Sequence, residues 1–264
     1  MRIEAEGLTW AVAGRIIVRD VGLRVESGET VGLIGPNGSG KSSLLRCLAG
    51  LRTPAAGVVR YDGQDIRGWS ARRIATSVAF VQQAAEADND LRVADVVSLG
   101  RTPHRGPWRG LGRTDRLIVE AALERLGLTG LRSGRWRTLS GGERQRTHIA
   151  RALAQQPRCI LLDEPTNHLD VRHQLELMDL LAGTDQTVLV ALHDLSLAAR
   201  YCDRLVLVHH GRLIAGGTPQ EVLTTERLRD VFGVDAHLDH DALGNTSITY
   251  RGVAAREGGP VRQR

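Results

Sequence analysis

The sequence predicts an α/β protein with a mixed, mainly parallel core sheet, an N-terminal antiparallel β subdomain and an α-helical insert subdomain. Three observations support this prediction. The first 30 residues consist of short β-like pieces, the middle third has helical periodicity, and short apolar runs alternate with helices in the part that follows.

The N-terminal part begins with β-like pieces at Arg2–Ala5, Ile16–Val18 and Leu23–Val25, which are separated by glycine-containing breaks. These pieces predict a small antiparallel sheet. The apolar run Val31–Ile34 comes next, followed by a glycine-rich turn, and Ser42–Leu48 then has the pattern of a helix. The expected order at this point is therefore strand, loop, helix.

The middle third of the chain is predicted to be a helical insert subdomain at about residues 84–157. Helical periodicity runs from Ala94 to Leu128 and is interrupted by a loop rich in Pro, Gly and Arg at Pro103–Gly112. A further helix is expected at about Gly142–Gln155.

The part after the insert has the pattern of a parallel sheet covered by helices on both faces. The expected strands are Cys159–Leu162 and Thr187–Leu192, and the expected helices are Val171–Leu181 and Leu195–Tyr201. A terminal hairpin is expected from Leu205–Val208 and Arg212–Ile214.

The C-terminal end is expected to add little to the core. His237–Asp241 contains metal-ligand residue types, but we interpret it as a solvated turn after the last core element. The residues beyond Gly252 are rich in Gly, Pro and Arg, which predicts a frayed tail. We therefore expect a domain at residues 1–240 and an extension at residues 241–264 with a flexible end.

Length and composition favour one soluble domain. The chain has 264 residues, which is enough to bury a sizeable core. No apolar stretch approaches the roughly 18 residues that cross a bilayer, and the first residues lack the apolar core of a signal peptide, so we expect a cytosolic chain. Cys47, Cys159 and Cys202 are far apart and lack CxxC spacing, which predicts buried thiols rather than disulfides or a zinc site.

The charge of the chain is basic but dispersed. The net charge is +5, and because no block of basic residues occurs we expect no nucleic-acid partner. Of the 35 Lys and Arg residues, only Lys41 is a lysine. Drift towards arginine explains the other basic residues. It does not explain Lys41, but a site that fits a compact ammonium bridging phosphates can exclude the larger guanidinium.

A complete phosphate-loop pattern lies between the predicted strand and helix. It reads Gly35-Pro36-Asn37-Gly38-Ser39-Gly40-Lys41-Ser42, with Ser43 adjoining it among the expected nucleotide-binding residues. The glycines let backbone N–H groups surround a β-phosphate, Lys41 is expected to bridge β- and γ-oxygens, and the Ser42 hydroxyl is expected to bind Mg²⁺. We therefore predict ATP and Mg²⁺ as ligands.

The apolar strand Cys159–Leu162 ends in two carboxylates, Asp163 and Glu164. Asp163 is expected to reach Mg²⁺, usually through water, and Glu164 to polarise the water that attacks the γ-phosphorus. Taken alone, the pair could equally be an acidic helix N-terminus. The phosphate loop upstream favours the catalytic interpretation.

The segment Leu139–Gln145 identifies a family. Ser140, Gly141 and Gly142 at a helix start form an anion-binding nest. The segment resembles the signature motif of the ABC ATPases, and the resemblance runs from about Leu8 to Val234. It implies a P-loop ABC ATPase fold and a head-to-tail homodimer in which the Ser140 segment of one subunit closes on the γ-phosphate held by Lys41 of the other.

The same resemblance implies roles for further residues. Gln83 resembles the glutamine that senses Mg²⁺ and the attacking water, with Gln82 as the competing choice. Asp170 resembles the residue of the loop that crosses the dimer interface, and His193 resembles the switch histidine that hydrogen-bonds the γ-phosphate.

The residue that stacks on adenine departs from the family pattern. The family places an aromatic near the end of the first strand, where this chain has Val12, and Trp10 lies two residues earlier on the same face. The sequence leaves open whether Trp10 or Val12 meets the base.

The segment Asp95–His104, together with Glu164–Asp170 and Ala191–Leu195, resembles the importer ATPases that serve ferric siderophores, haem and cobalamin. This resemblance implies polytopic permease subunits as partners, an extracytoplasmic substrate-binding protein as an indirect partner, and a location at the cytoplasmic face of the membrane.

The alternative function is that of a soluble ABC ATPase acting on ribosomes or nucleic acid. The translation-associated type carries two cassettes, whereas this chain has one. The DNA-repair type inserts a long coiled coil between phosphate loop and signature, and the sequence has none. An exporter with a separate membrane domain also stays open.

Overall fold

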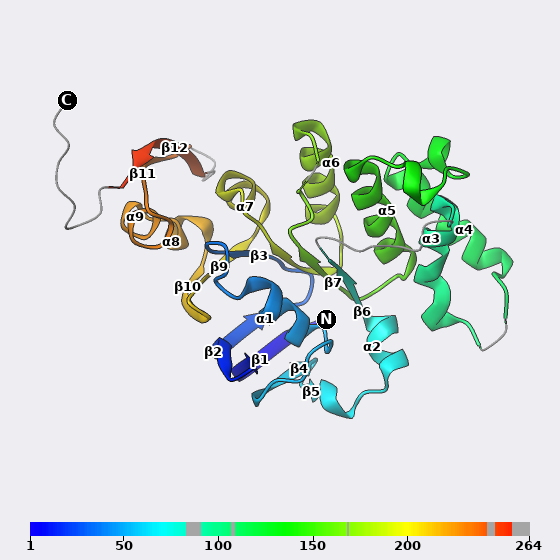
Figure 1. The fold of residues 1–264 in the computed structure, drawn as a ribbon, viewed down its shortest axis with the longest axis horizontal. Coiled ribbons are helices and arrows are strands. Elements are labelled where there is room, and N and C mark those ends of the chain that lie inside the picture. Colours follow the sequence, from blue (N-terminus) through cyan, green and yellow to red (C-terminus); the bar gives the residue numbers. More distant parts are fainter. Residues whose placement is uncertain (83–90, 107–108, 168, 242–245, 255–264) are drawn as a thin grey trace.

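The computed structural model describes residues 1–82, 91–106, 109–167, 169–241 and 246–254. Its centre is a six-stranded sheet with the strand order β10-β9-β3-β8-β7-β6 (Figure 1). All neighbouring strands are parallel except β10 and β9, so the predicted mixed, mainly parallel sheet is confirmed. The strands are β3 (Thr30–Ile34), β6 (Val78–Val81), β7 (Cys159–Asp163), β8 (Thr187–Ala191), β9 (Arg204–His209) and β10 (Arg212–Gly217).

The central strands are buried on both faces. Every residue of β3, β7 and β8 is buried, which explains why these strands are short apolar runs without polar alternation. One face packs on α5, α6 and α7, and the other face packs on α1 and the N-terminal antiparallel sheet. Because β3, β8 and β7 run parallel to one another, their carboxyl ends meet at one edge of the core.

The N-terminal subdomain is an antiparallel sheet with the order β2-β1-β4-β5, as expected. Its strands are β1 (Ile3–Val12), β2 (Arg15–Val25), β4 (Ala56–Tyr61) and β5 (Gln64–Asp65). The first two strands are longer than the short predicted pieces. Gly7, which suggested a break, has a φ of +59° and lies at a register shift between Ala5 and Leu8, so it marks a bulge within a continuous strand.

Most of the helices lie where the periodicity predicted them. The structure adds α2, α8 and α9, which were not predicted. None of the helices in the described ranges is long and apolar enough to cross a membrane. The α-helices are α1 (Lys41–Leu48), α2 (Ala71–Ser77), α3 (Val93–Ser98), α4 (Arg113–Arg125), α5 (Gly141–Ala154), α6 (Val171–Ala182), α7 (Leu195–Tyr201), α8 (Pro219–Val222) and α9 (Thr225–Phe232), and the short 3₁₀ helices include η1 (Ile66–Gly68) and η2 (Leu99–His104).

The helical insert is a bundle of α3, α4 and α5 that lies to one side of the core sheet (Figure 1). Its η2 segment packs tightly on α5, because a Cβ added at Gly100 would lie 2.2 Å from the carbonyl oxygen of Arg151. The buried Arg101 donates to Asp115 of α4 at 2.9 Å and to the carbonyl of Ala154 at 2.8 Å. The Asp95–His104 segment thus joins the helices of the insert.

The C-terminal end differs from the prediction. His237–Asp241 is not a solvated turn, because residues Val234–His240 form β11, which pairs antiparallel with β12 (Thr246–Val253). In this hairpin β12 packs against α7 and β11 against α9, beyond the last strand of the core. The expected boundary at residues 240 and 241 therefore falls between two paired strands. Of the predicted frayed tail, residues 255–264 lie outside the described ranges.

Candidate nucleotide-binding site

The phosphate loop runs from the end of β3 to the start of α1, as the sequence predicted. Two glycines allow its course. Gly35 has a φ of +147° and a Cβ there would lie 2.1 Å from the carbonyl oxygen of Val208, and Gly40 has a φ of +107° with a Cβ position 2.9 Å from the carbonyl oxygen of Ile17. Any other residue at these positions would push the loop away from β9 and β2.

Lys41 begins α1 and its side chain folds back over the loop. Its ammonium donates to the carbonyl oxygens of Gly35 at 2.7 Å and Pro36 at 3.2 Å. Burial is the main cause that lowers the pKa of Lys41, against the opposing effect of Glu164 and Asp163. The only lysine of the chain is thus a partly desolvated cation held at the loop, where it can exchange carbonyl oxygens for phosphate oxygens.

Ser42 and Asp163, two of the three residues expected at Mg²⁺, are in direct contact. Ser42 Oγ donates to Asp163 Oδ1 at 2.7 Å, and Arg46 lies 3.9 Å from Asp163 Oδ2. Asp163 is 1% exposed, and burial raises the pKa of its carboxyl. A hydroxyl and a carboxylate beside a phosphate loop are the oxygen donors that suit Mg²⁺, which binds few protein ligands and completes its shell with phosphates and water. The residues therefore fit the expected ion.

Two hollows open at the loop. One, of about 330 Å³, includes nearly all of the loop together with Glu164, and the other, of about 490 Å³, lies where the loop meets the ends of β7 and β8. The first is lined by Arg15, Ile17, Asn37, Gly38, Ser39, Gly40, Lys41, Ser42, Ser43 and Glu164, and the second by Asn37, Gly38, Ser42, Glu164, Asn167 and His193. The structure thus brings together the phosphate loop, Glu164 and His193, as predicted from the sequence.

Glu164 is held from two sides. His193 Nε2 contacts Glu164 Oε1, and Asn167 Nδ2 donates to Glu164 Oε2 at 2.9 Å. Glu164 itself has a φ of +53° and is 8% exposed. A left-handed backbone at a non-glycine residue is uncommon and clusters at functional sites. His193, expected to meet the γ-phosphate, contacts the carboxylate expected to be the general base.

The signature residues lie apart from these hollows. Ser140 caps α5: its Oγ accepts from the N–H of Glu143 at 3.3 Å, and its own N–H donates to Glu143 Oε2 at 2.7 Å. These bonds, led by the one from the Ser140 N–H, hold the pKa of Glu143 below its usual value. Ser140 and Gly141 are exposed, Gly142 is half-buried, and none of the three lines either hollow.

Asp170 also lines neither hollow. Asp170 caps α6, where its carboxylate accepts from the N–H of His173 at 2.9 Å. Gln83 lies outside the described residues, so its predicted role stays a prediction. Its neighbour Gln82 is described and exposed.

The sequence left open which residue meets adenine. Neither of the two residues considered for adenine stacking lines the hollows: Val12 is 51% exposed, and Trp10 packs partly into the core with Arg52 6.0 Å from its ring centre. Arg15 and Ile17 of β2 are among the residues that line the hollow of about 330 Å³ instead. Their contact with the loop depends on how β2 crosses over α1, and no sequence signal marks it.

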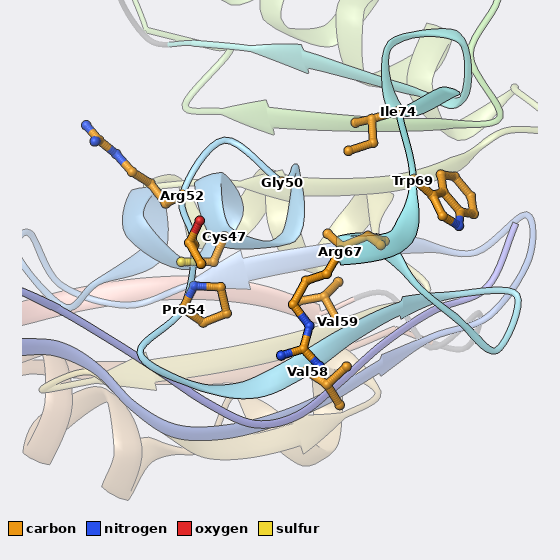
Figure 2. Close-up of a pocket in the computed structure, with 11 residues that line it drawn as sticks. Cys47, Gly50, Arg52, Pro54, Val58, Val59, Arg67, Trp69 and Ile74 are labelled. Atoms are coloured by element: carbon orange, nitrogen blue, oxygen red, sulfur yellow. The ribbon is translucent and has the colours of Figure 1, made fainter. Parts of the chain in front are cut away.

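A separate apolar cavity of about 200 Å³ lies between α1, β4, η1 and α2 (Figure 2). Val58, Val59 and Ile74 supply much of its lining, Cys47 of α1 lies at one side, and Trp69 lies at the other. Its lining contains neither carboxylates nor residues of the phosphate loop, which distinguishes it from the site described above.

Two of the His and Asp residues of β11 lie close together. His237 Nε2 and Asp239 Oδ1 lie 3.1 Å apart as a simple pair. Within the part of the chain that the structure describes, no group of three or more His, Cys, Asp or Glu side chains is arranged to hold a metal ion.

Comparison with known proteins agrees with this geometry. The chain is 45% identical over 259 residues to the hemin import ATP-binding protein HmuV of Pseudomonas entomophila, covering 94% of this chain and 100% of that one. It is 35% identical over 251 residues to the ferric enterobactin transport ATP-binding protein FepC of Escherichia coli, covering 94% of this chain and 93% of that one.

Its fold matches the dimeric structure of a post-hydrolysis state of the ATP-binding cassette MJ0796 bound to ADP and Pi. The TM-score is 0.73 at 27% identity, over 82% of this chain and 98% of that one. Residues 18–167 match the family model described as ABC transporter. The chain therefore belongs to the ABC transporter family, as one of its ATP-binding, ATP-hydrolysing subunits.

Proposed function

We propose that this subunit powers an importer for a ferric siderophore, haem, cobalamin or a similar metal chelate. In this proposal two copies form a head-to-tail homodimer at the cytoplasmic face of the membrane, beneath polytopic permease subunits. An extracytoplasmic substrate-binding protein delivers the cargo to the permease. The names of the relatives, HmuV for hemin and FepC for ferric enterobactin, support the cargo class over a soluble role on ribosomes or nucleic acid.

One observation carries the dimer. The phosphate loop, Glu164 and His193 share adjoining hollows, whereas the Ser140 nest at the start of α5 is exposed and lines neither of them. A nest of N–H groups at a helix start is a binding site for an anion, and within one subunit the Ser140 N–H is bonded to the carboxylate of Glu143 rather than to a phosphate. A second copy supplies the γ-phosphate that completes it, with the loop at Asp170 crossing the interface.

The reaction is in-line transfer of the γ-phosphoryl group to water. Lys41 exchanges the Gly35 and Pro36 carbonyl oxygens for β- and γ-phosphate oxygens. Glu164 accepts a proton from the attacking water, after His193 leaves its carboxylate and donates to the γ-phosphate.

Ser42 and Asp163 hold the metal site. Mg²⁺, when bound there with ATP, neutralises charge on the phosphate oxygens. Ser42 Oγ and Asp163 Oδ1, which are hydrogen-bonded to each other at 2.7 Å, are the oxygens that would hold the ion. Gln83, outside the described residues, is the further ligand that the family resemblance implies.

The experiment that tests this assignment is Glu164→Gln. We expect this variant to bind MgATP like the parent, to remain dimeric with ATP in size-exclusion chromatography with light scattering, and to lose about 10²–10³ in kcat, because it lacks the base that assists the transition state. Hydrolysis at the parental rate would contradict the role of Glu164, and an ATP-bound variant that stays monomeric would contradict the dimer.

The cargo is tested in cells. Disruption of the gene is expected to abolish uptake of one among radiolabelled ferric siderophore, haem and cobalamin, and complementation with Glu164→Gln is expected not to restore it. Unchanged uptake of all three would contradict the proposed cargo class while leaving the ATPase assignment intact.

A further inference from the structure

We propose that Asn167 is a positioning residue for hydrolysis: its side-chain amide fixes the orientation of the Glu164 carboxylate. The inference rests on the proposed role of Glu164 as general base and adds a residue that acts through it. Asn167 follows Glu164 by three residues and lines the hollow that also contains Ser42 and His193.

The two oxygens of Glu164 have different partners. Oε2 accepts from Asn167 Nδ2 at 2.9 Å, and Oε1 contacts His193 Nε2. When His193 turns to the γ-phosphate, Oε1 becomes available to the attacking water. The bond from Asn167 to Oε2 can persist through this change, so that the carboxylate keeps its direction while one oxygen takes up the proton.

An amide suits this position chemically. It donates a hydrogen bond to the carboxylate without adding charge beside Lys41 and the phosphates, and it has no acidic proton to exchange with the attacking water. A carboxylate there would face Glu164 as a like charge, and an aliphatic side chain would leave Oε2 without its donor.

The backbone allows the side-chain amide to be tested separately from the loop. Asn167 N–H donates to the Glu164 carbonyl at 3.3 Å, a bond that survives substitution of the side chain. Gln174 of α6 independently holds the same loop, because its Nε2 donates to the carbonyl oxygens of Thr166 and Leu169 at 3.2 Å each. Gln174 does not line the hollow, and its side-chain amide is bonded to the loop carbonyls rather than to Glu164, so it provides a matched control for loop order.

The experiment compares Asn167→Ala, the isosteric Asn167→Asp and Gln174→Ala in the full-length protein. We expect kcat to fall about 10–100-fold in Asn167→Ala and further in Asn167→Asp, with KM for MgATP within about two-fold of the parent, because the substituted group orients a catalytic side chain and does not bind the nucleotide. Gln174→Ala is expected to lower kcat by less than about three-fold.

A double-mutant cycle gives the decisive readout. If Asn167 acts through Glu164, adding Asn167→Ala to Glu164→Gln does not lower the single-turnover rate further. A general loosening of the loop instead lowers this rate by the same factor in the parent and in Glu164→Gln. Equal losses in both backgrounds, a rise in KM in place of a fall in kcat, or an unchanged kcat would each overturn the proposal.

Failure of the two proposals can be told apart. Parental hydrolysis by Glu164→Gln alone refutes the general base, and a slow Glu164→Gln beside a fully active Asn167→Ala refutes only the role of Asn167. Thermal melting and binding of a fluorescent ATP analogue check that each variant is folded. If Asn167→Ala does not fold, the kcat of the isosteric Asn167→Asp tests the role of Asn167.

Discussion

Ser42 Oγ and Asp163 Oδ1 are joined by a 2.7 Å hydrogen bond although 121 residues separate them in the chain. The bond links the start of α1 to the end of β7, and it lies beside Lys41 and Glu164, which adjoin its two partners in sequence. The core sheet therefore positions the two expected metal-binding oxygens before any ion arrives.

Because of this contact, we expect substitution of Ser42 to change mainly the Mg²⁺ dependence of ATP hydrolysis. Ser42→Ala removes one oxygen donor while Asp163 remains, so we expect the Mg²⁺ concentration that gives half-maximal ATPase activity to rise by about 10-fold or more. Ser98→Ala, which deletes a hydroxyl bonded within α3 to the Ala94 carbonyl, is the control. An equal Mg²⁺ requirement in Ser42→Ala and Ser98→Ala would contradict the assignment.

The position of Arg15 in the hollow at the phosphate loop predicts a role for it in nucleotide binding. Because Arg15 lines the loop hollow and Val12 does not, Arg15→Ala is expected to weaken binding of a fluorescent ATP analogue about two- to five-fold, as for loss of an exposed cation–π contact with adenine. Val12→Ala is expected to leave affinity unchanged. Inorganic tripolyphosphate, which lacks a base, distinguishes the causes: if Arg15→Ala weakens its binding equally, Arg15 acts on the phosphates instead.

Gly100 predicts a stability effect away from the site. A Cβ at this position meets the Arg151 carbonyl oxygen at 2.2 Å, so Gly100→Ala must displace η2 from α5 at a cost of about 1–3 kcal/mol. We expect the melting temperature to fall by several degrees while ATP affinity is retained. Gly130→Ala is the matched control, since a Cβ there has no neighbour within 4 Å. Equal melting temperatures for both variants would refute the packing argument.

The three thiols predict a pH dependence. Burial raises the pKa of Cys47 to about 11 and the pKa values of Cys159 and Cys202 to about 12, from 9.0. The unfolded chain therefore ionises first, so these groups favour the folded state fully below pH 9 and lose that contribution as the pH rises to about 12. The free energy of unfolding, measured by denaturant titration, is expected to decline across this range.

The same thiols provide a direct measurement at neutral pH. We expect them to resist a thiol reagent in the native protein and to react on unfolding, with Cys47 first because it lines the cavity of Figure 2 and has the smallest pKa shift. Fast native labelling of Cys159 would contradict its buried position.

Local patterns were sufficient for the parts of the site that lie in one segment. The phosphate loop, Asp163 and Glu164 could be predicted because each stands directly after an apolar run that forms a buried strand. Asn167 lies within the segment Glu164–Asp170 that carries the family resemblance, but its hydrogen bond to Glu164 depends on the left-handed backbone at Glu164, which sequence pattern does not reveal.

Parts that depend on distant contacts were missed. β4 pairs with β1 across some fifty residues, and β5 then pairs with β4. The polar residues of β11 resemble a solvated turn in the sequence, and they form a strand because β12 pairs with them. Arg15 lies at the site only because β2 crosses beside the phosphate loop. Neither Trp10 nor Val12 lines the hollow at the phosphate loop, whereas Arg15 and Ile17 of β2 do.

The order of the core strands also has a consequence for biosynthesis. β3 does not pair with β7, because β8 lies between them. A ribosome must therefore make the chain through Ala191, the last residue of β8, before Ser42 can lie against Asp163 within the sheet. The two oxygens expected to hold the metal therefore come together within the sheet only after nearly three quarters of the chain has been translated.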